Sequence, residues 1–595
     1  MHKIQKTPKK PTTDDSEEHV AFLGIDFTET PQAPQRLTQS KVEILTAQQQ
    51  QDDHYSGCVD VNDALERLQS EVLARMFGEN GRWQVIWCCL LSAFQGASTL
   101  HIFCYVFQTI AKDYWCARPD TAPDMDVSLW RNLSQPAGAC TILNLNYTQL
   151  TESAGTAESA QLIPCTNFEF SREDGSARSL IEEFGLICSH EKLVSVVEMC
   201  FLAGAAVGSV SSGWISDRFG RKHTLMAFVL VQIISGTLLA YSVNLPMFMT
   251  LRVIAGFASM TVTVVSFVLV VELVSGRWRT ITGILNILPV PISYILMAGI
   301  AYFIRDWRKL QLVITLPWLS LLSIWYCMPE SPRWLLAQGR LNDLYALIER
   351  AAALNQRTLP PNYKKTLEAA APPPMQKPIN GSATVKGQLT NVQTQQQHTL
   401  PAFMSVPEGG ADSNGATTAS TTEAMNLIVW LTLIIIYYGL TLHLSNLGGD
   451  IYLNTSVAGG IEAVAICVSI FVVLKVGLRR SLIAYMLVPG ISCLATNLVP
   501  TGDDNQTVIV VLAIIAKCVI GANNAIIPSY TAMQYPTVVR NFGVGMGNLA
   551  AGVALILVPY MWLLEHVDPL LPMSIMGVSG IIGAISLFLM KDIQQ

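Results

Sequence analysis

The sequence predicts an all-α membrane protein with twelve transmembrane helices, and three observations carry that prediction. Of the 595 residues, 51% are hydrophobic and only 14% are charged, whereas about 25% of the residues in a soluble domain are charged. The charges gather in residues 1–82, 111–192 and 333–425, which leaves long apolar runs between them. A membrane-spanning helix needs about 20 mostly apolar residues, because the hydrocarbon core of a bilayer is roughly 30 Å thick.

Twelve apolar windows reach this length, six before the polar stretch at 333–425 and six after it. They lie at 84–110, 193–215, 223–242, 247–271, 280–303, 310–328, 425–446, 452–475, 479–499, 507–531, 540–563 and 570–590. Two equal halves are typical of membrane folds built from internal repeats. We therefore divide the chain into an N-terminal region (1–82), a first six-helix bundle (83–332), a loop (333–424) and a second six-helix bundle with a short tail (425–595).

Loop charge predicts the orientation, because Lys and Arg collect in cytoplasmic loops. Cations follow the second, fourth, eighth and tenth windows: Arg218, Arg221, Lys222, Arg277, Arg279, Lys475, Arg479, Arg480 and Arg540. One loop does not follow this charge pattern: Arg305, Arg308 and Lys309 come after the fifth window. We expect both termini and the loop 333–424 to be cytoplasmic. Residues 1–80 hold no apolar run long enough for a signal peptide, so the first helix is expected to act as its own insertion signal.

The segment 111–192 then falls outside the cell, and its composition agrees. It carries two N-glycosylation sequons, at Asn132 and Asn146. It also carries an even number of cysteines, which predicts disulfides in an oxidising compartment. These four disulfide candidates are Cys116, Cys140, Cys165 and Cys188, and their spacing leaves the pairing open. A further sequon at Asn380 falls on the cytoplasmic side and is expected to stay unmodified.

Two polar regions contain predicted helices. Apolar residues recur at helical spacing between Val61 and Phe77, which predicts an amphipathic helix lying along the inner membrane surface. The loop 333–424 opens with a predicted helix from Leu341 to Asn355. It then becomes rich in Pro, Gln, Ser and Thr, a composition typical of a disordered linker.

Two short motifs carry a family resemblance. Residues 213–222 read Gly-Trp-Ile-Ser-Asp-Arg-Phe-Gly-Arg-Lys, which resembles the signature loop of the major facilitator superfamily. Residues 329–335 read Pro-Glu-Ser-Pro-Arg-Trp-Leu, which resembles an element of its sugar-porter and organic-ion branches. The second-half segments 438–452 and 535–541, together with the long cysteine-bearing loop 111–192, are similar to those of the organic cation, carnitine and organic anion transporter family. This resemblance covers about residues 61–590 and implies a major facilitator fold.

The chain departs from that family at two positions. Gln534 stands where the family usually has Glu, and Gly552 stands where it usually has a charge, acidic in cation carriers and basic in anion and carnitine carriers. An acidic residue at 552 is therefore expected to favour cations, provided that the helix has room for it.

Ionisable and aromatic residues inside the spans are candidates for a solute site, because burying a charge in a membrane is costly. Glu462 is expected to attract an ammonium group, and Trp430 and Tyr437 lie seven residues apart on one helix face, where their rings suit a cation. The resemblance places these three residues at the pocket positions of the organic cation branch. The alternative for Glu462 is a structural ion pair with a cation such as Lys517. Asn286 and His443 complete the candidate solute-binding set. Hydrogen bonding between helices is the alternative for Asn286, and His443 is expected to donate a hydrogen bond at the outer mouth rather than to carry a proton.

A second set of residues is expected to form a gate on the cytoplasmic side. Asp217, Arg218 and Arg221 lie in the signature loop, and Glu272 ends the fourth helix seven residues before Arg279. We expect these groups to form ion pairs that close the inner side of the protein.

These features together predict a transmembrane transporter of organic cations or zwitterionic amines in the plasma membrane. It is expected to work by alternating access, driven by the solute gradient or the membrane potential. A carnitine-like zwitterion or organic anion carrier is the first alternative, and a transporter-derived solute receptor is the second. The sequence contains no nucleotide-binding, catalytic or metal-ligand pattern. We therefore expect no enzyme activity, no cofactor, no metal and no nucleic-acid partner; the partners are a small solute and the lipid bilayer.

Overall fold

The computed structural model describes most of the chain beyond residue 68. The described residues are 69, 71–78, 80–110, 112–118, 126–135, 138–143, 161–171, 177–371, 413–442, 450–499, 506–534, 537–564, 567–568 and 570–590. The predicted sites at Asn146, Asn380 and His443 lie outside these residues.

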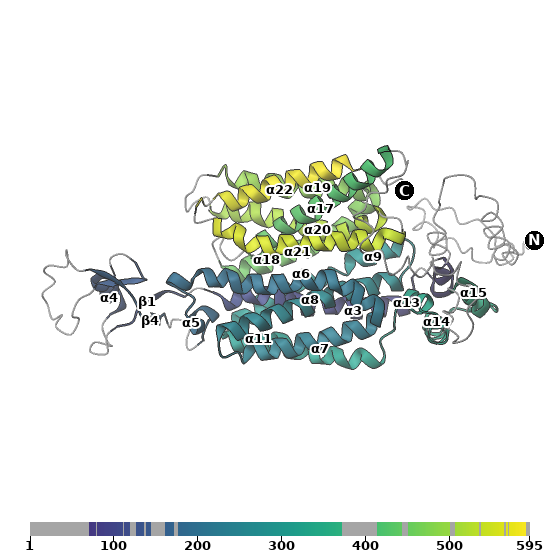
Figure 1. Ribbon diagram of the computed structural model, residues 1–595, viewed down its shortest axis with the longest axis horizontal. Coiled ribbons are helices and arrows are strands. Elements are labelled where there is room, and N and C mark those ends of the chain that lie inside the picture. The colour runs from purple at the N-terminus through teal and green to yellow at the C-terminus, as the bar shows by residue number, and fades with distance from the viewer. Residues whose placement is uncertain are drawn as a thin grey trace, which may run out of the picture. The chain divides into compact units, whose positions relative to one another are not determined.

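Twelve helical segments among the described residues are long and apolar enough to cross a membrane, as the sequence predicts, so this is a multi-pass membrane protein. In the first half they are α3 (Arg82–Gln108), α6 (Lys192–Phe219), α7 (Arg221–Ala240), α8 (Leu245–Leu273), α9 (Arg277–Leu285) with α10 (Pro289–Phe303), and α11 (Trp307–Thr315) with α12 (Leu319–Leu322). In the second half they are α17 (Ser413–Leu442), α18 (Ile451–Val476), α19 (Leu478–Thr496), α20 (Gln506–Gln534), α21 (Thr537–Leu563) and α22 (Leu571–Leu589). Figure 1 shows the two sets as neighbouring bundles.

The halves meet mainly along two helix pairs, α6 with α21 and α10 with α18, and α9 also contacts α18 and α20. At the first pair, a Cβ on Gly552 would lie 2.9 Å from Cβ of Ala206. At the second, a Cβ on Gly459 would lie 2.7 Å from the carbonyl oxygen of Pro291. Small residues are needed at such contacts, because helices in lipid associate through close packing rather than through the hydrophobic effect. We call these two contacts the seam.

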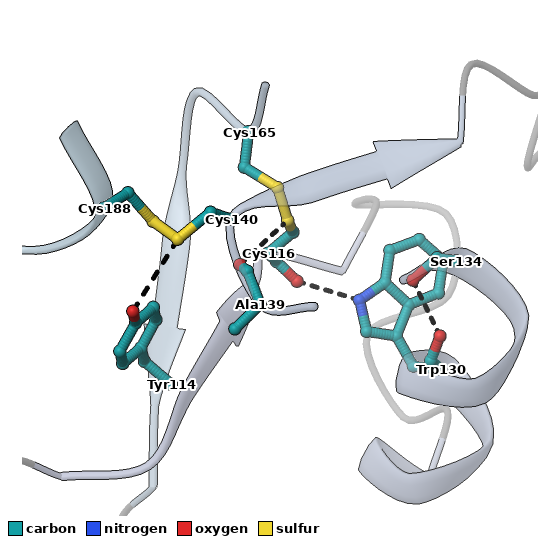
Figure 2. The surroundings of a disulfide bond; sticks show 8 residues. All are labelled: Tyr114, Cys116, Trp130, Ser134, Ala139, Cys140, Cys165 and Cys188. Atoms are coloured by element: carbon teal, nitrogen blue, oxygen red, sulfur yellow. Dashed lines mark hydrogen bonds between the residues drawn. A yellow bond between two sulfur atoms is a disulfide. The ribbon is translucent and has the colours of Figure 1, made fainter. Parts of the chain in front are cut away.

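The segment between α3 and α6 forms a small disulfide-linked domain. Strand β1 (Tyr114–Cys116) pairs antiparallel with β4 (Phe168–Phe170), and β2 (Thr141–Leu143) with β3 (Leu162–Pro164). The four predicted cysteines form the bonds Cys116–Cys165 and Cys140–Cys188, drawn in Figure 2. Helix α4 (Val127–Ser134) covers the first bond, because the Trp130 indole donates a 2.8 Å hydrogen bond to the Cys116 carbonyl. We call this side of the protein the disulfide side; Asn132 is exposed there.

Helix α5 (Leu180–Phe184) anchors that domain to the first half. The Glu183 carboxylate accepts a 2.7 Å hydrogen bond from the Trp307 indole and pairs with the Arg308 guanidinium. Burial raises the pKa of the Glu183 carboxyl, but the hydrogen bonds from Arg308 and Trp307 outweigh it and hold the pKa below its usual range. The anchor is therefore intact at neutral pH and is lost when acid protonates Glu183. Arg308 belongs to the loop after the fifth window, whose positive charge is the exception to the predicted topology. Its ion pair with Glu183 explains why an arginine lies on this side of the protein.

Short helices gather on the opposite side, which we call the linker side. They are α13 (Pro332–Ala337), α14 (Leu341–Asn355) and α15 (Tyr363–Ala370), so the predicted helix 341–355 is confirmed. Residues 71–77 are helical, but their apolar face does not lie along a membrane. Val72, Leu73, Met76 and Phe77 pack in one core with residues of α13, α14 and α15. For residues 71–77 the helix is confirmed and the expected contact with the membrane is wrong, because protein helices rather than lipid cover the apolar face. Residues 61–68 and 70 of the predicted helix lie outside the described residues.

Candidate solute site and gate

The signature loop forms a charged network on the linker side. The Arg221 guanidinium lies 2.8 Å from the Asp217 carboxylate and 3.1 Å from that of Glu272. Glu330, from the second motif, accepts backbone hydrogen bonds from Arg221 (2.9 Å) and Lys222 (3.0 Å) at the start of α7. Carboxylates are favourable at that position, because the first N–H groups of a helix have no partner within it. The two motifs thus recognise each other directly.

Gly220 makes this contact possible. Its φ of 90° lies in the left-handed region that favours glycine, and a Cβ there would lie 2.6 Å from the second Glu330 oxygen. The motif glycine is required both by the turn and by the carboxylate beside it.

The network includes three of the five predicted gate residues. Asp217, Arg221 and Glu272 lie together within the first half, and the partner of Glu272 is Arg221. The Arg218 guanidinium instead lies 5.8 Å from the centroid of the exposed Trp214 ring. Arg279 is half-buried at the start of α9.

A buried ion pair joins two helices of the second half. The Lys517 ammonium of α20 is 2.9 Å from the Glu462 carboxylate of α18, and the two side chains are 1% and 0% exposed. The Tyr437 hydroxyl donates a 3.2 Å hydrogen bond to the other Glu462 oxygen. That hydroxyl is also 2.7 Å from the hydroxyl of Tyr294, which belongs to α10 of the first half. The pair is therefore linked by hydrogen bonds across the seam.

Aromatic rings also surround the Lys517 ammonium. It lies 3.6 Å from the centroid of the Tyr437 ring and 5.1 Å from that of Tyr294. Such cation–π contacts are worth about 2 kcal/mol or more each where water is excluded. The Tyr437 ring, predicted to hold a solute cation, is in contact with the protein's own cation. The structural alternative for Glu462, an ion pair with Lys517, is what the geometry shows.

Gly521 provides the space for the carboxylate. A Cβ at this position of α20 would lie 2.4 Å from the Glu462 Oε1 atom. No side chain fits there while Glu462 keeps its present position.

A cavity adjoins this ion pair, and both halves contribute to its wall. The lining residues are Phe103, Val106 and Phe107 of α3, Tyr294 and Met297 of α10, Thr441 of α17, Thr455 and Ala458 of α18, and Lys517 of α20. The wall is mostly aromatic and aliphatic, with two hydroxyls from threonine. Lys517 is the one charged residue among these lining residues. Such a mixture is common in small-molecule sites, where few polar groups orient a ligand held by apolar surface.

Trp430 and Asn286, two further predicted solute-binding residues, are not among the residues that line this cavity. The Trp430 indole donates a 2.9 Å hydrogen bond to Thr531, and a Cβ on Gly547 would lie 2.7 Å from its nitrogen, so Trp430 is packed inside the second half. Asn286 is fully buried in the first half and accepts a 2.9 Å hydrogen bond from Ser92. The structure thus brings Tyr437 and Glu462 together and leaves Trp430 and Asn286 apart from them.

Sequence reasoning missed Phe103, Phe107 and Tyr294. Aromatic residues are common in every predicted span, so no signal in one sequence separates these three from the rest. Only the approach of α3 and α10 to α18 selects them.

Gly552 has no room for a charged side chain. Its missing Cβ is the reason that α21 can contact Ala206 of α6. The position at which related carriers have a charge is used here for helix packing, so the room on which the expected effect of an acidic residue depends is absent.

Two membrane-embedded six-helix halves around a cavity that both of them line define a membrane transporter of the major facilitator fold. A family model described as "Sugar (and other) transporter" matches residues 144–564. The chain is 30% identical to the "Organic cation transporter protein" of Drosophila melanogaster, over 87% of this chain and 91% of the relative. It is also 30% identical to the human "Organic cation/carnitine transporter 2", over 88% and 91%.

The fold has known counterparts in solved structures. The inward open form of the xylose transporter XylE from E. coli matches with a TM-score of 0.52 at 15% identity, over 85% of this chain and 95% of that one. The protein belongs to the sugar (and other) transporter family of the major facilitator superfamily, in its organic cation and carnitine transporter branch. Nothing in these comparisons supports the solute-receptor alternative.

The buried ion pair predicts a specific pattern of mutational effects. Glu462→Gln or Lys517→Gln alone leaves one buried charge without a partner, which costs about 3–5 kcal/mol. The double variant removes both charges and should regain most of that loss. Thermal unfolding of the purified protein in detergent measures all four forms. A double variant as unstable as the worse single variant would contradict the structural role of the pair.

The space beside Glu462 predicts a contrast between two glycines. Gly521→Ala should displace the carboxylate and destabilise the protein, because the new methyl group would overlap Oε1. Gly460→Ala on α18 is the matched control, since a Cβ there meets nothing within 4 Å. Unfolding temperature and surface expression should fall for the first variant and stay unchanged for the second. Equal behaviour of the two would show that Glu462 is not confined as described.

Proposed function

We propose that the protein carries organic cations or zwitterionic amines across the plasma membrane by alternating access. In this proposal the disulfide side is extracellular, and the linker side and both termini are cytoplasmic. The protein performs no covalent chemistry; the membrane potential contributes about 2.3 kcal/mol per charge per 100 mV to cation entry. The observation that carries the proposal is the aromatic cavity at the seam, because a site lined by both halves opens alternately to either side when the halves rock.

The names of the relatives and the aromatic wall support the solute class. Proteins named as organic cation and carnitine transporters match nearly the whole chain. Phe103, Phe107 and Tyr294 line the cavity, and aromatic rings suit an ammonium or quaternary ammonium group. Tyr437 and Glu462 support this wall, while Trp430 and Asn286 act as packing residues behind it.

The ion pair bears on the charge of the solute. Since Glu462 is neutralised by Lys517, the site presents no free carboxylate to a cation. Lys517 reaches the cavity wall, so a solute carboxylate has a cation to approach. This observation favours the carnitine-like zwitterion alternative, in which the ammonium lies against the rings and the carboxylate against Lys517. A plain anion gains only the second of these contacts.

The signature loop is proposed to act as the cytoplasmic gate. Along the seam, Met199 contacts Tyr560, Ala206 meets Gly552, and Ser209 donates to the carbonyl of Asn548. From Met199 to Ser209 the chain advances along α6, while the partner residues on α21 go backwards from Tyr560 to Asn548, so the two helices are antiparallel. About two more turns along α6 therefore bring Asp217 opposite the start of α21. The positive end of that helix dipole favours a carboxylate there. Asp217 with Arg221 and Glu272 would then stabilise the form closed to the cytoplasm.

Uptake into cells tests the proposed function. We expect saturable uptake of labelled tetraethylammonium or carnitine, and little uptake of urate. Tetraethylammonium entry should fall when the membrane is depolarised, because its charge couples it to the potential, while carnitine entry should not. Uptake of urate alone, or of none of the three by protein shown to be at the surface, would refute the proposal.

A pair of aspartates tests the gate. Asp217→Ala should reduce uptake several-fold with surface expression retained, because its half-exposed ion pair adds little to stability. Asp343→Ala is the control, since Asp343 also pairs with an arginine (Arg340, 2.7 Å) on the linker side but lies in α14. Initial uptake rates corrected for surface protein give the comparison. Equal rates for the two variants would leave Asp217 without a gating role.

A further inference from the structure

Three helix ends meet where the cavity approaches the disulfide side. Helix α3 ends at Gln108 and leads into β1 of the disulfide-linked domain. Helix α10 ends at Phe303, just before the α11 residues that hold Glu183 of that domain. Helix α18 of the second half begins at Ile451 beside these two first-half helices. Both halves therefore reach the disulfide-side end of the cavity.

Tyr452, the second residue of α18, joins these helix ends through its ring. The ring is stacked on that of Phe107 of α3, with centroids 5.7 Å apart and planes at 24°. It also meets the ring of Tyr302 of α10 edge to face, at 5.6 Å. Phe107 lines the cavity and is 6% exposed, whereas Tyr302 is 52% exposed. The three rings therefore run from the cavity wall to the surface of the protein.

An apolar cluster surrounds the Tyr452 ring. Phe107, Met297 and Ala301 of the first half belong to its buried part, and Tyr452 packs against them. Thr455, about one turn deeper in α18, lines the cavity. Tyr452 thus lies between the cavity and the disulfide side, among side chains that exclude water.

The backbone of Tyr452 is held in place by hydrogen bonds. The Asp450 carboxylate accepts one of 2.8 Å from the Tyr452 N–H and one of 3.2 Å from the Leu453 N–H, which caps the start of α18. The Ser456 hydroxyl donates a 2.8 Å hydrogen bond to the Tyr452 carbonyl. The ring is therefore carried by a capped helix of the second half and moves with that half.

The ring contacts are distant from the point where the backbones of α10 and α18 approach each other. That point is Gly459, whose missing Cβ leaves room for the Pro291 carbonyl. Tyr452 precedes Gly459 by seven residues, about 10 Å along a helix. Backbones in contact at Gly459 can act as a pivot when the halves rock, whereas contacts between side chains at the helix ends separate. The contacts of Tyr452 with Phe107 and Tyr302 must break for the disulfide side to open.

We infer that Tyr452 is the gate that closes the cavity towards the disulfide side. The inference rests on the proposed function, because a gate requires a protein that opens to both sides in turn. While Phe107 and Tyr302 hold the Tyr452 ring, a solute in the cavity is shut off from that side. When the second half rocks away, Tyr452 leaves both rings together with α18. Contacts between rings are individually weak, so this gate opens without separating charges, unlike the ion-paired network on the linker side.

Thiol labelling of the cavity tests the gate. Thr455→Cys places a thiol on the cavity wall, and a membrane-impermeant maleimide is applied to intact cells. The labelling of protein without this substitution is subtracted. Adding Tyr452→Ala should raise the labelling rate about tenfold, because two ring contacts that keep the gate closed are lost. Tyr452→Phe should keep the rate of the Thr455→Cys parent, since both ring contacts remain.

Two further variants control for general loosening of the fold. Tyr241 is 63% exposed at the disulfide-side end of α7, and α7 packs on α8, α6 and α11 of its own half. Tyr241→Ala should therefore leave the labelling rate unchanged. Tyr452→Leu keeps an apolar side chain in the cluster and should label as fast as Tyr452→Ala. A parent-like rate in both Tyr452→Ala and Tyr452→Leu, or an equal rise in Tyr241→Ala, would overturn the inference.

Uptake separates the gate from the proposed function. Initial uptake of labelled tetraethylammonium, corrected for surface protein, should fall several-fold in Tyr452→Ala and persist in Tyr452→Phe, because a protein that stays open to one side completes fewer cycles. Normal uptake in Tyr452→Ala with parent-like labelling would overturn the gate and leave the proposed function standing. Faster labelling of Tyr452→Ala, in a protein that takes up neither tetraethylammonium nor carnitine, would support the gate and refute the proposed solutes.

Discussion

Close packing of α6 on α21 and of α10 on α18 is the constraint on which the rest of this structure depends. Lipid provides no hydrophobic force between helices, so the halves are held by backbone approach and by hydrogen bonds. Gly552 and Gly459 permit that approach, each at a point where a methyl group would overlap the partner helix. The cavity and the Tyr294–Tyr437 hydrogen bond both follow from where this packing sets the two halves.

Close packing between the halves also limits where charged side chains can lie near the site. The close packing at Gly552 leaves no room for a charged side chain there, and the described fixed charges beside the cavity are Lys517 of α20, which lines it, and its partner Glu462 of α18. Glu462 and Lys517 are both fully buried, and each is tolerable only because the other is present. A site beside such a neutral pair recognises a solute by aromatic contacts and by Lys517, which lines the cavity, rather than by one strong attraction.

Charges outside the membrane have local structural roles that loop counting does not reveal. Arg308 breaks the charge rule for its side of the protein because it holds Glu183 of the disulfide-linked domain. Glu330 binds backbone N–H groups of the signature loop, so two motifs that lie more than a hundred residues apart form one unit. The roles of Arg308 and Glu330 both depend on a partner that comes close only in the folded chain.

The sequence by itself determined the twelve spans, the division into halves, the disulfide-forming cysteines and the helix 341–355. These features are local: hydropathy, charge and helical spacing act over a few turns of one segment, and the family motifs are contiguous. It also supplied Glu462 and Tyr437 as candidates, and Lys517 as a possible partner, because a charge inside an apolar window is conspicuous.

The tertiary structure alone decided which of these groups meet. In the folded chain Glu462 pairs with Lys517, and the Trp430 side chain packs inside the second half. Phe103 and Phe107 line the cavity, and protein rather than lipid covers the helix 71–77. The pairing of the four cysteines was decided there too. The physical reason is that each of these outcomes depends on distances between segments that are far apart in the chain. Packing between helices sets such distances, and one sequence read along its length does not contain them.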